Sequence, residues 1–269
     1  MPKTEYGYVT VSGGQVHYAE QGRGPAVLLL HQTPRSLDEF RELQPLLADG
    51  HRVIAIDMPG FGNSTALLPV PQRIEDYARG TLAALDALGV DRTAVVGHHT
   101  GGVVAVELAA TAHDRITAVV LSSTPWTDAA HRASHVDGPG VDDAPRDPGG
   151  CHLLAWWEQR RPYYPPGATG LLDRFVRDAL APGVDPREGH LACARYEVER
   201  RIGHVRAPVL LLGAADDPFV LPALEPMARH LTAAAVVDQA VIEGGTVALM
   251  EDKAEDVAAV VLPFLRRFT

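Results

Sequence analysis

Residues 93–112 read TAVVGHHTGGVVAVELAATA, and this stretch decides the fold. Its first part is a short apolar run, typical of a strand that is buried on both faces. Its last part has the length and composition of a helix. Between the two parts, Gly97 and Gly101 flank His99, and small flanking residues permit a strained turn that lifts one side chain above a sheet. The stretch therefore predicts a strand, a sharp turn that presents His99, and a helix.

Similar apolar runs recur on both sides of this unit. They lie at 26–30, 52–56, 116–121, 208–212 and 234–237, with helix-length segments at 37–47, 74–88, 222–231 and 254–267. Two earlier runs, at 6–11 and 15–19, flank a Ser-Gly-Gly turn and predict a hairpin. Alternating strands and helices predict an α/β fold, with a mostly parallel sheet and helices on both faces. Ligands of such sheets bind at the carboxyl ends of the strands.

The alternation stops between Trp126 and Val205, where no strand-like run occurs. A gap of this length is too long for an ordinary loop. We expect helices at about 151–161, 169–180 and 187–202 within it. The sequence thus predicts a core made of residues 1–126 and 206–269, with a mainly helical cap inserted at residues 127–205.

Composition limits the classes of partner. The chain has 24 Lys and Arg against 34 Asp and Glu, a formal net charge of −10, so its field repels nucleic acid and anionic membranes. Its apolar runs are too short to span a bilayer, and the N-terminus MPKTEYGYVT has no signal-peptide features. We therefore expect a cytoplasmic protein with reduced cysteines and a small-molecule partner. A homodimer remains open.

Five motifs resemble the α/β-hydrolase family. They are LLLHQTP at 28–34, IDMPGFGNS at 56–64, GHHTGG at 97–102, LLGAADDPF at 211–219 and IEGGTVALMED at 242–252. They occur in the family's order over nearly the whole chain. The resemblance implies an α/β-hydrolase fold with a cap insertion, and a cofactor-independent hydrolase that acts on a small apolar carbonyl compound such as an ester or a lactone.

Two positions depart from the family pattern. His99 stands at the nucleophile position, which is usually Ser, Asp or Cys, and Thr246 stands at the position of the catalytic histidine. Motif spacing favours Asp216 over Asp217 as the acid. A histidine at the turn is longer than a serine, so its ring can reach the acid directly. We expect a His99–Asp216 pair in which His99 is a general base and Thr246 a hydrogen-bonding partner.

Several other chemistries remain open. Thr246 could attack after activation by His99, or His99 could attack directly and form an acyl-imidazole. A lyase, isomerase or cyclase would need only proton abstraction by His99. The fold could also serve a ligand-binding protein without turnover, or belong to an inactivated variant. Labelling by an activated phosphonate separates a covalent hydrolase from the remaining classes.

The resemblance also implies how the pocket is built. Backbone N–H groups of Thr33 and Thr100 match the two donors of an oxyanion hole. Gln32, where the family often has Gly, either adds an amide to the pocket or tightens its loop. Trp126 and Trp157 are the expected substrate contacts, because aromatic rings stack on planar or cyclic ligands.

Four other histidines have more ordinary interpretations. We expect His31 to pack beneath its loop, and His98 to be a buried imidazole that points away from the turn. His131 and His135 lie near acidic residues, but their spacing is too loose for a metal site. No nucleotide-binding or zinc-protease motif occurs in the chain, so neither a cofactor nor a metal is expected.

Overall fold

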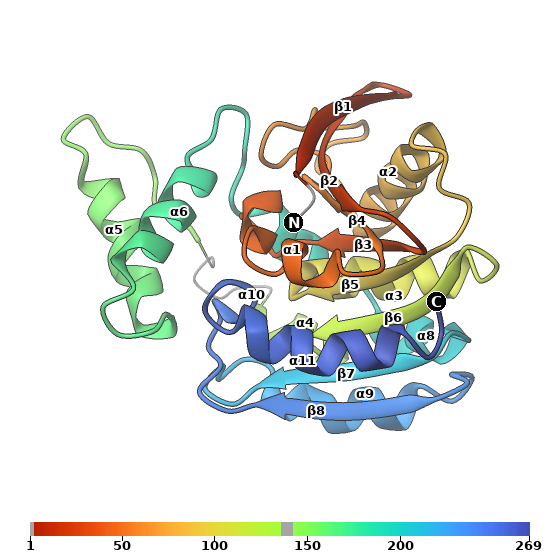
Figure 1. Cartoon of the computed structure of the whole chain (residues 1–269). Helices are drawn as coiled ribbons and strands as arrows, with labels where there is room; N and C mark the ends of the chain where they lie inside the picture. Colours follow the sequence, from red (N-terminus) through yellow and green to blue (C-terminus); the bar gives the residue numbers. More distant parts are fainter. Residues whose placement is uncertain (1–2, 136–141) are drawn as a thin grey trace.

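A mostly parallel sheet forms the centre of the molecule in a computed structural model that describes residues 3–135 and 142–269 (Figure 1). The described residues form eight strands in the order β1-β2-β4-β3-β5-β6-β7-β8. The pairs β1–β2 and β2–β4 are antiparallel and the others parallel. The strands are β1 (Glu5–Val11), β2 (Gly14–Gly22), β3 (Ala26–Leu30), β4 (Arg52–Ile56), β5 (Thr93–His98), β6 (Ile116–Ser122), β7 (Val209–Ala214) and β8 (Val237–Ile242).

Helices cover both faces of this sheet. One apolar core joins the sheet to α2 (Ile74–Ala87), α3 (Thr100–Thr111) and α9 (Leu224–His230). A second core lies on the opposite face, beneath η1 (Leu37–Phe40), α1 (Gln44–Leu47), α10 (Leu249–Asp252) and α11 (Ala254–Leu265). A short 3-10 helix, η4 (Leu221–Ala223), precedes α9. The predicted α/β architecture is confirmed.

Two predicted boundaries were wrong. The last strand is β8 at Val237–Ile242 and not residues 234–237, because β8 lies at the sheet edge and alternates partly buried and exposed positions. An edge strand needs no continuous apolar run. The helix expected at 37–47 is divided into η1 and α1, and Pro45 occupies the first turn of α1.

The described residues between β6 and β7 contain helices and no strand. These are α4 (Ala129–His135), α5 (Cys151–Arg160), η2 (Arg161–Tyr163), α6 (Thr169–Ala179), α7 (Glu188–Cys193), α8 (Val198–Arg201) and η3 (Ile202–His204). Sequence analysis missed α4, where the Asp128 carboxylate caps the helix by accepting from the N–H of His131 at 2.8 Å. Figure 1 shows α5 and α6 beyond the carboxyl ends of β6, β7 and β8.

A buried arginine joins this helical segment to the core. Arg35 follows β3 and is fully buried. It donates to Asp178 of α6 at 2.9 Å and to both carboxylate oxygens of Glu251 in α10 at 2.8 and 3.0 Å. These three charge-assisted hydrogen bonds link the loop after β3 to α6 and to α10.

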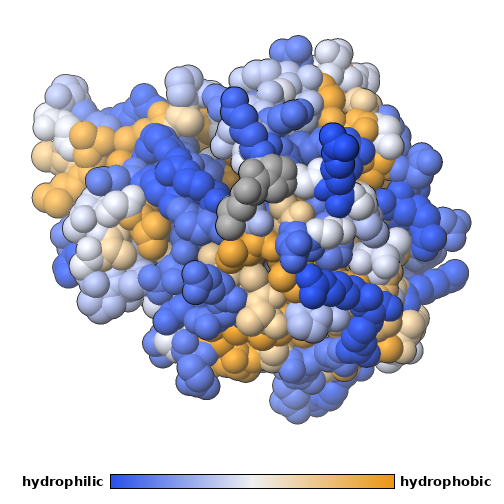
Figure 2. All heavy atoms as spheres, viewed as in Figure 1, coloured by the Kyte–Doolittle hydropathy of each residue, from blue (hydrophilic) through white to orange (hydrophobic). Residues whose placement is uncertain are grey.

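The face shown in Figure 2 is mainly polar, with hydrophobic residues on the side of α5 and α6 and also in the centre and lower part of the view. Helix α5 exposes Leu153 and Leu154, which are 46% and 64% accessible. Within the described ranges, no helix has both the length and the apolar character needed to cross a bilayer.

Candidate active site

The turn between β5 and α3 has the geometry that the sequence predicted. His99 adopts φ 48° and ψ −113°, which is a strained conformation for a residue with a side chain. The flanking glycines are sterically required. A Cβ on Gly101 would lie 2.0 Å from the carbonyl oxygen of Leu30, and one on Gly97 would lie 2.3 Å from the carbonyl oxygen of Gly101.

From this turn the His99 ring reaches the loop after β7. Its Nε2 lies 2.8 Å from Oδ2 of Asp217. The Asp217 side chain is fully buried, and its other oxygen accepts from the N–H of Phe219 at 3.0 Å. Burial opposes ionisation of Asp217, but the nearby His99 outweighs it and holds the pKa of this carboxyl below its ordinary value. The pair is therefore a fixed imidazole–carboxylate unit.

The structure pairs His99 with Asp217 and not with Asp216, the residue that motif spacing favoured. The Asp216 side chain is exposed, and its N–H donates to the carbonyl oxygen of Gly245 at 2.7 Å. Strand β7 ends at Ala214, and the N–H of Asp217 closes a turn onto the Ala214 carbonyl at 3.2 Å. This turn directs the second carboxylate of the Asp-Asp pair, rather than the first, towards His99.

Thr246 does not make the predicted hydrogen bond with His99. Its hydroxyl accepts from the N–H of Ala248 at 3.2 Å, which stabilises a local turn. The neighbouring Val247 lines the cavity beside His99, and Thr246 is not among the residues that do.

His98 is a buried structural imidazole, as expected. Its Nε2 donates to the carbonyl oxygen of Val247 at 3.1 Å, and its Nδ1 accepts from the Ser122 hydroxyl at 3.1 Å. Burial and the neighbouring His99 lower the pKa of His98 to about 4. The two adjacent rings meet edge to face, with centroids 4.6 Å apart. His98 is therefore neutral at pH 7 and supports His99 from below.

His31 also packs beneath its loop. Its Nδ1 donates to the Gln32 carbonyl at 2.8 Å, and its Nε2 accepts from the N–H of Met58 at 2.9 Å. The backbone and side-chain amides of Gln32 donate to the buried Glu39 at 2.8 and 2.6 Å. Gln32 lines the cavity, but these bonds tighten its loop.

The two predicted oxyanion donors face the same cavity as His99. Thr33 and Thr100 both line it. Thr100 is the first residue of α3, so its N–H has no acceptor within the helix. Their role as oxyanion donors stays a prediction.

The cavity beside His99 has a volume of about 350 Å³. Trp126 and Trp157, the expected substrate contacts, are not among the residues that line it. Trp126 packs on His230, with ring centroids 4.7 Å apart, and Trp157 packs against a small apolar cluster of the cap. The residues that line the cavity are Gln32, Thr33, His99, Thr100, Pro125, His131, Asp142, Gln159, Arg160, Tyr163, His190, Cys193, Ala194, Phe219 and Val247.

Sequence reasoning missed the polar residues that the predicted cap contributes to this cavity. Tyr163 and Phe219 form its aromatic pair, with centroids 4.9 Å apart. His190 and Asp142 lie 48 positions apart in the chain and meet at 2.6 Å. No short motif joins two such positions, so no local signal pointed to them.

Cys193 is a further candidate nucleophile on the cavity wall. Burial raises the pKa of its thiol to about 12. The thiolate is the reactive form of cysteine, so Cys193 is unreactive at neutral pH. In the described parts of the chain, no group of three or more His, Cys, Asp or Glu side chains could hold a metal ion. Of the metal candidates weighed from sequence, the His135 side chain and Asp137 lie outside the described residues.

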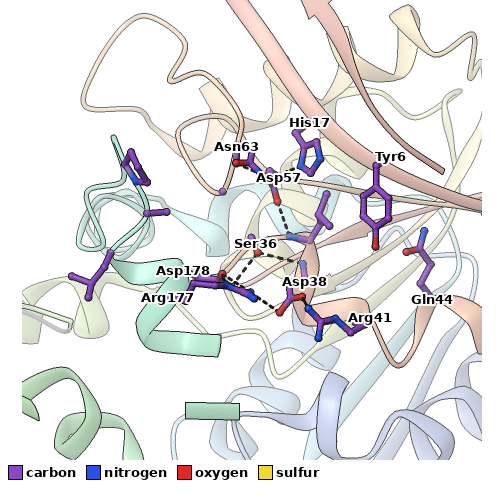
Figure 3. Close-up of a pocket in the computed structure, with 15 residues that line it drawn as sticks. Tyr6, His17, Ser36, Asp38, Arg41, Gln44, Asp57, Asn63, Arg177 and Asp178 are labelled. Carbon is purple, nitrogen blue, oxygen red and sulfur yellow. Dashed lines mark hydrogen bonds and ion pairs between the residues drawn. The ribbon is translucent and has the colours of Figure 1, made fainter. Parts of the chain in front are cut away.

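A second cavity, of about 540 Å³, contains another imidazole–carboxylate pair (Figure 3). Nδ1 of His17 lies 2.8 Å from Oδ2 of Asp57. The Asp57 oxygens also accept from the N–H groups of Leu37 and Asn63 at 2.7 and 2.8 Å. Asp57 therefore ties the first residue of η1 and the loop at Asn63 to β2.

Comparison with known proteins agrees with the fold described above. The family model for the alpha/beta hydrolase fold matches residues 25–251. The chain belongs to the alpha/beta hydrolase fold family. A putative carbamate hydrolase, RutD of Variovorax paradoxus, is 32% identical over 217 residues, which are 76% of this chain and 79% of that protein.

Bifunctional epoxide hydrolase 2 of Mus musculus is 39% identical over 128 residues, which are 45% of this chain. The match covers 22% of that longer protein, so the chain spans about a fifth of this relative. Among solved structures, the epoxide hydrolase CorEH superposes with a TM-score of 0.79 at 22% identity, over 98% of this chain and 99% of that one. The enol-lactonase of Burkholderia xenovorans LB400 gives 0.75 at 21% identity, over 97% and 100%. These likenesses show the shared fold, and the relatives named here are hydrolases.

Proposed function

We propose that this chain hydrolyses small, largely apolar esters or lactones, with His99 as a general base towards water. The observation that carries the proposal is the 2.8 Å contact between His99 Nε2 and Asp217 at the wall of a cavity of about 350 Å³. Because Asp217 accepts from Nε2–H, the neutral ring carries its lone pair on Nδ1. That nitrogen is the one available to take a proton from water.

The reaction needs no covalent intermediate. Nδ1 of His99 removes a proton from water, and the hydroxide adds to the substrate carbonyl carbon. The N–H groups of Thr33 and Thr100 stabilise the oxyanion that forms. The tetrahedral adduct collapses as the bond to the leaving oxygen breaks, and the leaving oxygen takes up one proton. The products are a carboxylic acid and an alcohol.

The names of the relatives support a hydrolase that acts on small electrophiles. They include a putative carbamate hydrolase, an enol-lactonase and epoxide hydrolases. We favour a carbonyl substrate over an epoxide, because the proposed Thr33 and Thr100 donors would stabilise the oxyanion of a tetrahedral carbonyl adduct.

A substrate panel tests the proposal. Purified protein is assayed with γ-butyrolactone, ethyl butyrate, p-nitrophenyl butyrate and styrene oxide, beside the His99→Gln variant. Glutamine keeps an amide near the Nε2 position but has no basic nitrogen. We expect ester or lactone turnover that falls by about 10²–10⁴-fold in His99→Gln, and no labelling of the wild type by a fluorophosphonate. Turnover that survives His99→Gln, or stable labelling, would overturn it.

A further inference from the structure

Two histidines that each pair with a buried carboxylate line the same cavity. The first pair is His99–Asp217, which the sheet presents. The second is His190–Asp142, which the cap presents, with His190 Nε2 2.6 Å from Oδ2 of Asp142. The His190 side chain is 28% exposed and that of Asp142 is 1% exposed, and both residues line the cavity.

Asp142 is held in place by a buried arginine. Nε of Arg160 donates to Oδ1 of Asp142 at 2.7 Å, and a terminal nitrogen of Arg160 donates to Oδ2. The guanidinium also lies over the Phe175 ring, 4.7 Å from its centroid. Burial opposes ionisation of Asp142, but Arg160 and His190 outweigh it and keep the pKa of this carboxyl below its ordinary value.

The fold has no evident need for this cluster. A buried ion pair adds little stability compared with apolar residues of similar size. Ionisable groups that are buried at the wall of a cavity are instead typical of functional sites. The cluster fixes the orientation of His190, because Asp142 holds Nε2 and leaves Nδ1 as the nitrogen free of that carboxylate. His131 of α4 and His99 of the turn line the same cavity.

We infer that His190 is the second acid–base residue of the site, and that it protonates the leaving oxygen from the cap side. The inference rests on the proposed function. His99 takes a proton from the attacking water. As the carbon–oxygen bond breaks, Nδ1–H of the protonated His190 gives its proton to the departing oxygen. Neutral His190 then takes up a proton from solvent, and protonated His99 releases one, so the cycle balances.

This assignment defines a substrate class. The leaving group of an alkyl ester or a lactone is an alkoxide, which departs poorly unless it is protonated. A p-nitrophenolate departs without a proton. Acid assistance from His190 therefore benefits unactivated alkyl esters and lactones specifically, and the sensitivity to the leaving group separates this role from a merely structural one.

The test compares ethyl butyrate with p-nitrophenyl butyrate, which share an acyl group. His190→Gln keeps an amide near the Nε2 position to bond Asp142 but carries no transferable proton. We expect kcat for ethyl butyrate to fall by about 10²-fold or more, and kcat for p-nitrophenyl butyrate to change by less than about threefold. His152→Asn is the matched control, because His152 pairs with Asp147 in the cap at 3.6 Å and does not line the cavity.

The outcomes distinguish failure of the His190 assignment from failure of the proposed function. Equal losses on both esters, or no loss on either, would overturn the acid role of His190 and leave the His99 mechanism standing. Equal turnover by wild type and His99→Gln, or no turnover of either ester or of γ-butyrolactone by the wild type, would overturn the proposed function itself and this assignment with it. Thermal unfolding of each variant shows whether the fold is kept.

Discussion

Nε2 of His99 lies 2.8 Å from Oδ2 of Asp217, and this contact joins the turn after β5 to the loop after β7. The turn presents the histidine through a strained backbone, with φ 48°. A histidine at this position reaches the buried carboxylate without an intermediate residue. The arrangement combines the orienting acid and the base in two side chains.

The two adjacent aspartates should differ sharply in their effect on activity. Asp217→Asn removes the charge that orients His99, and we expect kcat/KM on the preferred ester or lactone to fall by about 10²–10⁴-fold. Asp216→Asn changes an exposed side chain and should leave kcat/KM within about twofold of the wild type. Steady-state kinetics of the two variants make the comparison. A larger loss in Asp216→Asn than in Asp217→Asn would reverse our assignment.

Thr246 should matter little on its own. Its hydroxyl accepts from the N–H of Ala248 and not from His99. We expect Thr246→Ala to lower the free energy of unfolding by about 1 kcal/mol, the net value of one hydrogen bond, and to change kcat by less than about threefold. Denaturant titration and kinetics measure both. A loss of activity as large as that of Asp217→Asn would show that Thr246 takes part in the reaction.

The double variant His99→Ser, Thr246→His should restore a serine-based site. The strained turn would present a hydroxyl, and an imidazole on the last loop would lie between it and Asp217. We expect a fluorophosphonate to label position 99 in the double variant but in neither single variant, as read by peptide mass spectrometry. Absence of labelling in a folded double variant would argue that Asp217 and the N–H donors are not placed for acyl transfer.

His98 should make stability depend on pH. Its pKa is lowered from 6.5 to about 4 by burial, so the unfolded chain binds a proton at a higher pH than the folded chain does. The stabilisation is complete above pH 6.5 and is lost as pH falls towards 4, by about 3 kcal/mol in total. Urea unfolding across this range measures it. In His98→Gln, which keeps a donor for the Val247 carbonyl, the dependence should flatten, and an unchanged slope would contradict the argument.

Arg35 should be a major contributor to stability. Arg35→Met removes the fully buried cation between Asp178 and Glu251 and leaves these carboxylates only Arg177 and Arg174 as partners, which we expect to cost about 3 kcal/mol. Arg41→Met is the control, because Arg41 is exposed and its pair with Asp38 is worth at most about 1 kcal/mol. Chemical unfolding compares the two, and equal losses would refute a special role for the buried arginine.

The sequence predicted the architecture because burial on both faces of a parallel sheet leaves continuous apolar runs. This holds for β3, β4, β5 and β7, whose residues are almost all buried. The continuous apolar run is absent from β8, because this strand lies at the edge of the sheet and most of its residues are partly or fully exposed. The turn at His99 was predictable for another reason, since the backbone excludes any side chain at Gly97 and Gly101.

The details of the site depend on tertiary contacts, which no local sequence motif predicts. A single turn after Ala214 decides which carboxylate faces His99, and spacing alone favoured the other one. Trp126 and Trp157 do not line the cavity, because each packs on its own neighbours instead. The His190–Asp142 pair depends on how the cap folds back on itself.

The most direct test of the central claim is the position of the proton on the His99 ring. Long-range ¹H–¹⁵N NMR of uniformly ¹⁵N-labelled protein, with His99→Gln to assign the signals, distinguishes a protonated from an unprotonated ring nitrogen. In the neutral ring, our account predicts that Nε2 carries the proton and Nδ1 the lone pair, and that Asp217→Asn removes this preference. A proton on Nδ1 in the wild type would contradict the orientation on which the proposed base chemistry depends.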